Sequence, residues 1–534
     1  MLMEKNEVYI GTCTGYNEDG AGVVRIEGIV LFVNGLLMGE TAEIGIMKMK
    51  KNYGYGRVVR LIEASEHRCT PRCTVYRQCG GCTLQHMDDA EQRRFKEEKV
   101  KLCFRANAGM EIEPLPILRD EPVWNYRNKV QIPCAYEQGR VKMGFYRTHT
   151  NDIVPYDACM VQTDLSNELT DWFRKHLGEA AKQVRHVLIK HAHMTDQVMV
   201  VLVVRKYPFV NSEAIIDQLV HAYKNISSVV VIVNKREDNV ILDGQEICVY
   251  GNPYIEEELL GCRFRISARS FYQINPYMTK RLYETAIEYA GLTGKEILID
   301  LYCGTGTMGL IASSKAKKVY GIEIVPEAVK DAEKNAEING IENIRFLNMD
   351  ASKGAQAMIR SKIKADAVIV DPPRKGCSKE TLDAIVTISP ERLVYVSCDP
   401  ATLARDVAIL REKGYELEKV QPVDMFPQTT HVETVVLLSK GEIDSKKVRV
   451  EFSLEDMDMS DFQDKATYTQ IKDYVLEHSG LKVSNLYISQ IKRKCGLEVG
   501  KNYNLPKAED SRQPQCPPEK ENAIREAMKY FGMI

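Results

Sequence analysis

Residues 297–323 read ILIDLYCGTGTMGLIASSKAKKVYGIE, and this stretch decides the fold class. An apolar run leads to Asp300, a loop with glycines at 304, 306 and 309 follows, and a helical pattern comes next. Glycines let a backbone approach a ligand closely, and the N-terminus of a helix is electropositive. Glu323 ends the next apolar run, where an acid can bind ribose hydroxyls. The loop is typical of NAD or S-adenosylmethionine sites, although a purely structural glycine turn has the same pattern.

The chain on both sides of this loop alternates short apolar runs with helical patterns. From about Ser270 the apolar runs are EILIDLY, KVYGIE, NIRFLN, ADAVIV and RLVYVS. This rhythm predicts a parallel, doubly wound sheet. The last two runs, ELEKVQPVDMF and VETVVLLSK, lie too close together for a crossover helix, so we expect them to be antiparallel.

The N-terminal half has a different pattern. Residues 1–65 contain several short strand-like runs with glycine turns, which predict a small barrel of the OB type. A charged helix is expected over Asp88–Ala106, and a mixed sheet follows up to about residue 265. After Lys440, residues 441–464 form an acidic linker, and residues 465–534 are basic with two short amphipathic helices.

Length and composition limit the class of protein. A chain of 534 residues is too long for one core, so we expect three or four domains. Its 44% hydrophobic and 27% charged residues exclude a disordered or collagen-like chain. With no apolar run long enough for a membrane span and no apolar signal core, we expect a soluble, cytoplasmic protein without a membrane partner. The 15 cysteines are therefore expected to be free thiols.

Two residues near predicted strand ends favour methyl transfer to a pyrimidine over hydride transfer. Carbon 5 of uracil becomes nucleophilic when a thiolate adds to carbon 6, and a base must then remove the carbon-5 proton. Cys398 and Glu433 could supply the thiolate and the base. From spacing alone, an inert core cysteine and a solvated acid are the alternatives.

A second group of cysteines lies at residues 73, 79 and 82, in the spacing C-x5-C-x2-C. Three thiolates need a fourth ligand, and a set of four suits either a [4Fe–4S] cluster or zinc. The spacing does not separate the two metals.

Several motifs in order resemble the TRAM-domain 23S ribosomal RNA uracil-5-methyltransferases, a class I, iron–sulfur family. The resemblance covers roughly residues 1–440. The motifs are Cys73-x5-Cys79-Gly-Gly-Cys82-x2-Gln85-His86, Ser270-Phe-Tyr-Gln273-x-Asn275, Asp300-Leu-Tyr-Cys-Gly304, Asp371-Pro-Pro-Arg374 and Ser397-Cys398-Asp-Pro-Ala-Thr-Leu-Ala-Arg-Asp406.

The resemblance implies roles for individual residues. Cys398 matches the family's nucleophile, and Glu433 matches its proton-abstracting base. The positions matching the S-adenosylmethionine site are Gln273, Tyr302, Gly304, Glu323, Asp350 and Asp371. The positions matching the ligands of a [4Fe–4S] cluster are Cys73, Cys79, Cys82 and Cys159, with Cys69 left unliganded.

The resemblance also implies a multidomain α/β architecture. The expected domains are a TRAM/OB-like barrel (1–65), a central mixed-sheet domain with the cluster (66–84 and 117–265) and a Rossmann-like methyltransferase domain (85–116 and 266–440). The linker (441–464) and the helical extension (465–534) lie outside the resemblance.

The resemblance implies a monomer that makes 5-methyluridine in 23S ribosomal RNA, an rRNA-processing enzyme that binds RNA. The alternatives are a transfer-RNA uracil-5-methyltransferase and a non-catalytic iron–sulfur RNA-binding factor. Aromatic and basic residues expected to line the RNA path are Trp124, Tyr126, Arg127, Lys129, Phe145, Tyr146 and Arg147. Extra RNA contact is hypothesised for Lys492, Arg493 and Lys494.

Overall fold

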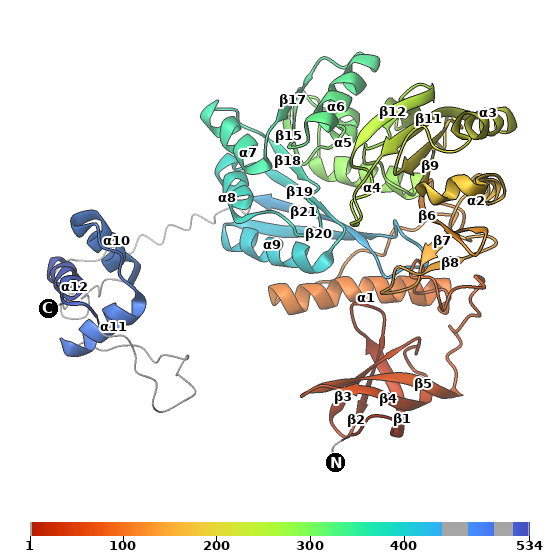
Figure 1. The fold of residues 1–534 in the computed structure, drawn as a ribbon. Coiled ribbons are helices and arrows are strands. Elements are labelled where there is room, and N and C mark those ends of the chain that lie inside the picture. Colours follow the sequence, from red (N-terminus) through yellow and green to blue (C-terminus); the bar gives the residue numbers. More distant parts are fainter. Residues whose placement is uncertain (1–2, 441–467, 496–515, 532, 534) are drawn as a thin grey trace. The chain divides into compact units, whose positions relative to one another are not determined.

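The computed structural model describes residues 3–440, 468–495, 516–531 and 533. The chain forms two compact units, Met1–Asp444 and Ser445–Ile534 (Figure 1). Every helix within the described ranges is too short or too polar to span a lipid bilayer. The predicted acidic linker lies outside the described residues.

The first unit begins with a closed five-stranded barrel. Its strands are β1 (Val8–Tyr16), β2 (Gly22–Ile26), β3 (Ile29–Asn34), β4 (Thr41–Met49) and β5 (Tyr53–Glu63). They pair in the order β1-β2-β3-β5-β4, and only β3 and β5 are parallel. The barrel interior holds fully buried apolar side chains such as Val24, Leu31 and Ile44. The predicted small N-terminal barrel is confirmed.

Helix α1 (Asp89–Ala108) follows the cysteine-rich segment. The Asp88 carboxylate caps it by accepting the Glu91 N–H at 2.8 Å, and Gly109, with φ +61°, ends it. Val100 and Phe104 of this helix are fully buried in the core of the C-terminal sheet. The predicted helix therefore packs against strands and helices that are distant from it in sequence.

A seven-stranded sheet occupies the middle of the unit. Its strands are β6 (Lys129–Glu137), β7 (Arg140–Tyr146), β8 (Ile153–Pro155), β9 (Val184–His191), β10 (Val198–Val204), β11 (Ile226–Val233) and β12 (Gln245–Gly251). They pair in the order β12-β11-β10-β9-β6-β7-β8. Only β10 and β11 are parallel, so the sheet is mixed, as the sequence predicts.

Both faces of this sheet are covered, which is why all seven residues of β10 are buried. Helices α2 (Asp164–His176) and α3 (Ser212–Ala222) pack on one face, near a 3-10 turn at Gly178–Lys182. The hairpin of β13 (Tyr254–Leu259) and β14 (Cys262–Ser267) packs on the other.

The C-terminal sheet of the first unit has the order β17-β16-β15-β18-β19-β21-β20. Its strands are β15 (Ile297–Leu301), β16 (Lys318–Glu323), β17 (Ile344–Asn348), β18 (Ala367–Val370), β19 (Arg392–Ser397), β20 (Tyr415–Val423) and β21 (Glu433–Lys440). The first five are parallel, and β21 is antiparallel to both β19 and β20. The doubly wound topology and the antiparallel final strands are both confirmed.

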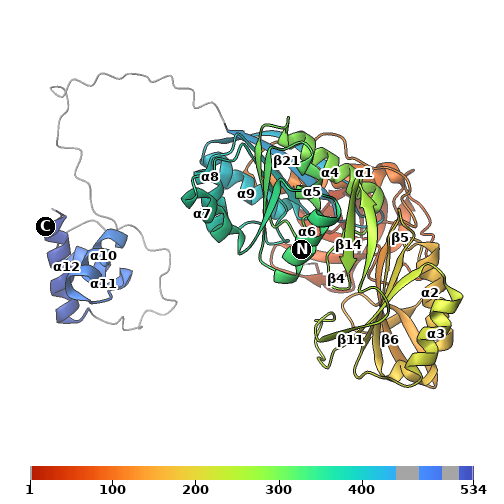
Figure 2. The ribbon, with the colours of Figure 1, turned by 90° about the horizontal axis from the view of Figure 1, so that it is seen from above.

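Together with α1, six further helices cover the two faces of this sheet. They are α4 (Pro276–Ala290), α5 (Thr307–Ser313), α6 (Pro326–Ile338), α7 (Ala351–Arg360), α8 (Lys379–Ile388) and α9 (Pro400–Glu412). Figure 2 shows α7, α8 and α9 on one face and α4, α5 and α6 on the other. The side chains of successive strand residues alternate between two separate cores, as strand geometry requires.

The second unit contains three described helices, α10 (Tyr468–Ser479), α11 (Asn485–Lys494) and α12 (Pro518–Tyr530). The two expected helices are present as α10 and α11, and a third, α12, supplies Ile524 and Met528 to a shared core. The hypothesis of an RNA-binding Lys492–Lys494 cluster is also weakened. Lys492 is only 7% exposed, and the Lys494 ammonium pairs with Glu521 at 2.6 Å.

Candidate active site

The glycine loop joins β15 to α5 at the carboxyl edge of the C-terminal sheet. Tyr302, Gly304 and Gly306 have φ values of +64°, +55° and +77°. Such values are strained for tyrosine and easy for glycine, and strain of this kind concentrates at ligand sites. The Gly304 N–H donates to the Glu323 carboxylate at 3.0 Å. The structure therefore brings together the loop and the acid that the sequence predicts.

A buried carboxylate lies directly under this loop. Asp300 is 2% exposed, and its Oδ2 atom has no hydrogen-bond partner among the described residues. Burial, together with the nearby charge of Asp371, raises the pKa of Asp300 to about 8. An added Cβ on Gly309 would lie 2.9 Å from this oxygen, so glycine is required there for packing as well. A buried carboxyl group with a raised pKa beside a strained loop is typical of a ligand site.

Two further acids lie at the same edge. Asp371 follows β18, and burial raises its pKa to about 7. Glu433 begins β21, is 4% exposed and has a pKa raised to about 8 by burial and by the charge of Asp371. The Arg374 guanidinium acts in the opposite direction on Glu433. Two neighbouring carboxyl groups with raised pKa values are typical of a catalytic site.

Cys398 lies next to Glu433 because of strand register. Ser397, the last residue of β19, is opposite Thr434 of β21. Because the two strands are antiparallel, Cys398, which follows Ser397, meets Glu433, which precedes Thr434, at the sheet edge. Burial and the Glu433 charge raise the pKa of the Cys398 thiol to about 11, and Arg374 lowers it. Cys398 is partly exposed, so a substrate can reach it. A thiol, a buried carboxyl group and a guanidinium thus face one site.

The segment that follows Cys398 holds it in place. The Ser397 hydroxyl accepts the Asp399 N–H at 3.1 Å, and Asp399 caps α9 by accepting the N–H groups of Ala401 and Thr402 at 3.0 and 3.1 Å. Cys398 therefore lies just before an electropositive helix N-terminus, which favours a thiolate.

Of the two other predicted cofactor residues, Asp350 lies at this edge and Gln273 lies in the segment that leads into α4. Gln273 is 8% exposed in the segment between β14 and α4, and its carbonyl accepts the Asn128 side-chain N–H at 3.2 Å. Asp350 follows β17 and caps α7, accepting the Ser352 N–H at 3.0 Å and its hydroxyl at 2.6 Å. Asp350 thus has a structural role that spacing did not predict, and its cofactor contact stays a prediction.

A buried network fixes the segment 424–432, which leads into Glu433. Lys96 of α1 is fully buried, pairs with the Asp424 carboxylate and donates to the Phe426 carbonyl at 3.0 Å. Arg119 pairs with the other Asp424 oxygen at 3.0 Å. Sequence analysis missed this network, because Lys96 resembled the solvated charges around it.

Further bonds reach the same segment from distant elements. Tyr126 donates to the Pro427 carbonyl at 2.9 Å, and Asn275 donates to the Met425 carbonyl at 3.1 Å. The N–H of Thr83, in the cysteine-rich segment, donates to the Gln428 carbonyl at 2.9 Å. The segment that leads into Glu433 is therefore held by α1, the central domain and the cysteine-rich segment together.

Replacing Lys96 with methionine is expected to destabilise the protein by about 3 kcal/mol, because Asp424 then stays buried without its closest cation. Lys101→Met in the same helix is the control. Its pair with Glu113, which is 86% exposed, is worth less than about 1 kcal/mol. Urea unfolding of both variants measures the difference, and equal losses would contradict a stabilising role for the buried pair.

The four predicted cluster cysteines line one hollow of about 510 Å³. Burial and the neighbouring cysteines, Cys159 first, raise the pKa of Cys82 to about 12. Cys69 does not line this hollow. Among the described residues, however, no three histidine, cysteine or acidic side chains are already arranged to hold a metal ion. The donors suit a cluster in number and kind, but the arrangement in this structure does not itself show one.

The residues predicted to line the RNA path separate into one group that lines the cysteine hollow and a second group, Trp124 and Lys129, that does not. Arg127, Phe145, Tyr146 and Arg147 line the cysteine hollow together with Tyr126. Tyr126 is only 1% exposed, so its prediction as an RNA contact is wrong. Trp124 packs under Arg72 at 5.1 Å, and Lys129 lies 5.6 Å over the ring of Phe271, which is 66% exposed.

Comparisons with known proteins agree on one family. A family model described as tRNA (uracil-5-)-methyltransferase matches residues 96–441. An RNA methyltransferase from Caldanaerobacter subterraneus is 43% identical over 448 residues, covering 82% of this chain and 98% of the relative. One from Clostridium tetani is 40% identical over 447 residues, covering 82% of this chain and 97% of the relative.

A solved structure has the same overall fold. The Pyrococcus abyssi tRNA (uracil-54, C5)-methyltransferase in complex with S-adenosyl-L-homocysteine matches with a TM-score of 0.64 and 26% identity. The match covers 80% of this chain and all of the other.

Proposed function

This chain belongs to the tRNA (uracil-5-)-methyltransferase family, and we propose that it methylates carbon 5 of a uridine in 23S ribosomal RNA. It is an S-adenosylmethionine-dependent RNA methyltransferase. The observation that carries the proposed chemistry is the pairing of β19 with β21, which supports placing the Cys398 thiol beside the Glu433 carboxyl group.

The proposed reaction uses Cys398 as nucleophile and Glu433 as base. The thiolate adds to carbon 6 of the flipped-out uracil, so that carbon 5 becomes nucleophilic. S-adenosylmethionine, when bound, supplies the methyl group that carbon 5 accepts. Glu433 in its ionised form then takes the proton from carbon 5. Elimination of the Cys398 thiolate restores the carbon 5–carbon 6 double bond and releases 5-methyluridine.

We assign the cofactor to the edge formed by the glycine loop. Gln273, Tyr302, Gly304, Glu323, Asp350 and Asp371 are the proposed contacts. The strained Tyr302 backbone and the buried Asp300 carboxyl group with its raised pKa support a ligand at this place. Two residues join the set that the sequence predicts. The Arg374 guanidinium acts to lower the pKa values of both Cys398 and Glu433. Asp300 is buried and accepts a backbone hydrogen bond from Gly309.

We also propose the domain division that the sequence suggests: barrel 1–65, central domain 66–84 and 117–265, methyltransferase domain 85–116 and 266–440, linker 441–464 and extension 465–534. Helix α1 packs in the core of the C-terminal sheet, which supports assigning residues 85–116 to the catalytic domain. The protein is proposed to act as a cytoplasmic monomer.

Ribosomal RNA is proposed as substrate because the motifs of this chain resemble those of the TRAM-domain 23S ribosomal RNA enzymes, in which an N-terminal barrel and a cysteine cluster also accompany the catalytic domain. Transfer RNA is the second candidate, since the similar P. abyssi enzyme is a tRNA methyltransferase. The test gives unmodified 23S ribosomal RNA and transfer RNA transcripts to the enzyme with labelled S-adenosylmethionine. We expect 5-methyluridine in the ribosomal transcript, whereas label in transfer RNA alone would establish the second candidate.

The hollow lined by Cys73, Cys79, Cys82 and Cys159 is proposed to hold a [4Fe–4S] cluster that orders the cysteine-rich segment. Protein isolated without oxygen is expected to contain about four irons per chain. Cys79→Ser should lose this iron, and Cys69→Ser should keep it, because only Cys79 lines the hollow. Metal analysis and visible absorption measure both variants. Colourless wild-type protein with one zinc would contradict the iron–sulfur assignment.

A further inference from the structure

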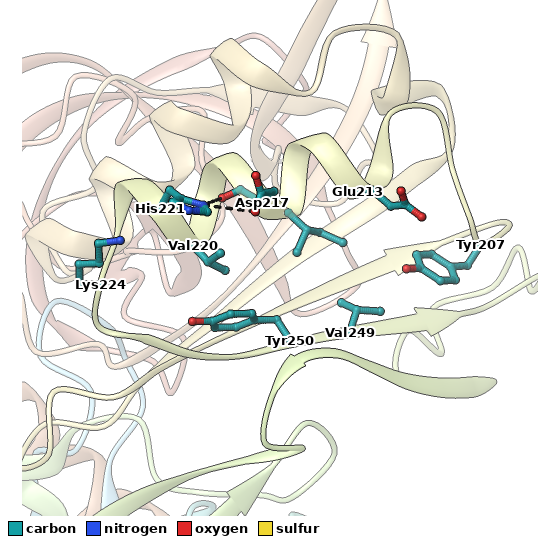
Figure 3. A pocket seen from close by; sticks show the side chains of 9 residues that line it. Tyr207, Glu213, Asp217, Val220, His221, Lys224, Val249 and Tyr250 are labelled. Atoms are coloured by element: carbon teal, nitrogen blue, oxygen red, sulfur yellow. Dashed lines mark hydrogen bonds and ion pairs between the residues drawn. The ribbon is translucent and has the colours of Figure 1, made fainter.

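Two hollows on the central sheet share the side chain of Tyr207 and differ in charge. The first, a groove of about 500 Å³ between α3 and β12, is shown in Figure 3. Glu213 and Asp217 lie along its α3 side, and Asp217 pairs with His221 at 3.3 Å. These carboxylates would repel a phosphate, so this groove is unsuited to a nucleic-acid backbone.

The second hollow, of about 690 Å³, has the opposite character. Its lining contains one acid, Asp243, and four basic residues, Arg205, Lys206, Lys235 and Arg236, which we call the basic edge. Strands β10 and β11 are parallel, with Val204 opposite Val233, so the residues that follow each strand emerge side by side. The Asn234 N–H donates to the Val204 carbonyl at 2.8 Å and fixes this arrangement. Two sequence-distant basic pairs thus form one surface.

Some of these charges are neutralised within the protein, and others are free. Arg236 pairs with Asp238 at 2.5 Å and with Asp243 at 3.3 Å. Arg205 lies 3.6 Å from Glu237, which is itself 85% exposed. Lys206 and Lys235 are exposed and contact no acid within the described ranges. Free ammonium groups beside partly paired guanidinium groups suit a phosphate backbone.

The basic edge is connected to the catalytic region by Arg269. Its guanidinium donates to the carbonyl of Gly244, a residue that lines the same hollow, at 2.5 Å. Arg269 immediately precedes the Ser270–Gln273 motif, and the Lys190 ammonium holds the start of this motif by donating to the Ser270 carbonyl at 2.9 Å. Arg269 therefore links the basic edge to the segment that contains Gln273.

We infer that the basic edge is a second RNA-contact surface, which binds phosphates of the RNA substrate outside the catalytic site. The inference rests on the proposed function in that the ligand is the RNA to be methylated. The contact is electrostatic and independent of base sequence, because the free groups are ammonium ions without a planar hydrogen-bonding edge. It increases affinity for long RNA and takes no part in the methyl transfer.

The test compares the wild-type full chain with Lys206→Ala/Lys235→Ala. Binding of a long 23S ribosomal RNA fragment is measured over a range of salt concentrations. Loss of two phosphate contacts should reduce affinity about tenfold at moderate salt and make the slope of log K against log salt shallower by about 2. The Lys206→Arg/Lys235→Arg variant keeps both charges and should bind as the wild type does.

The matched control is Lys315→Ala/Lys317→Ala, which removes two exposed lysines near the amino end of β16, opposite the carboxyl edge of that sheet. Methylation of a minimal stem-loop that fills only the catalytic site should be the same for the wild type and all three variants. Wild-type affinity and slope in Lys206→Ala/Lys235→Ala, or an equal loss in the control, would overturn the inference. If the wild type methylates no RNA, the proposed function is overturned. A salt slope that is still altered in Lys206→Ala/Lys235→Ala would then support this surface independently.

Discussion

Replacing Cys398 with alanine is expected to reduce methyl transfer to RNA by at least about four orders of magnitude. Without a thiolate at carbon 6, carbon 5 of uracil is too weak a nucleophile to accept a methyl group. The side chain is partly exposed at a strand end, so its removal leaves little cavity. Single-turnover incorporation of labelled methyl groups measures the loss directly.

Two controls separate loss of chemistry from loss of structure. Cys134→Ala removes another partly buried thiol, in β6 of the central sheet, and should keep wild-type rates. RNA affinity of Cys398→Ala should also stay close to that of the wild type, because the adduct forms after binding. A Cys398→Ala enzyme that methylates at more than a few per cent of the wild-type rate would contradict the covalent mechanism.

Replacing Glu433 with glutamine is expected to trap the reaction after the methyl group has been transferred. The amide fills the same buried space but does not accept the carbon-5 proton, so the thiolate cannot be eliminated. Turnover should fall by about three orders of magnitude. A covalent protein–RNA complex should accumulate on ordinary uridine RNA and be visible on a denaturing gel. Loss of turnover without any complex would assign Glu433 to an earlier step or to folding.

The pH dependence follows from the same carboxyl group. Burial and Asp371 raise the pKa of Glu433 to about 8, and the base acts only when it is ionised. The wild-type single-turnover rate should therefore rise steeply with pH below that value, where both Glu433 and the Cys398 thiol are still ionising. Above it the rate should rise by only about tenfold for each pH unit, because only the Cys398 thiol, with a pKa of about 11, is then still losing its proton. The rate remaining in Glu433→Gln should lack this inflection, and an inflection that persists would come from another group.

Much of the catalytic region could be predicted from the sequence because its signals are local. The loop requires positive φ values at Gly304 and Gly306, which glycine adopts without strain. Glu323, the acid that accepts the Gly304 N–H, ends the very next strand. The short gap before the last strand predicts an antiparallel pair, and this pairing brings Cys398 toward Glu433 across 35 positions of sequence.

The features that sequence analysis missed depend on contacts between distant residues. Lys96 is one of six basic residues in a charged helix, and only its packing against Asp424 shows that it is buried. Tyr126 has the aromatic–basic neighbours of an RNA contact, yet its hydroxyl is bound inside the protein. Lys206 and Lys235 become one surface only through the parallel pairing of β10 and β11.

The most direct test of the central claim is mass spectrometry of the adduct with 23S ribosomal RNA that carries 5-fluorouridine. Fluorine cannot leave carbon 5 as a proton does, so a methylated covalent complex should persist after S-adenosylmethionine is added. Digestion is predicted to give one modified peptide, with the methylated fluorouracil nucleotide attached to Cys398. An adduct on another cysteine, or unmodified Cys398 in enzyme that still methylates ordinary RNA, would contradict the account.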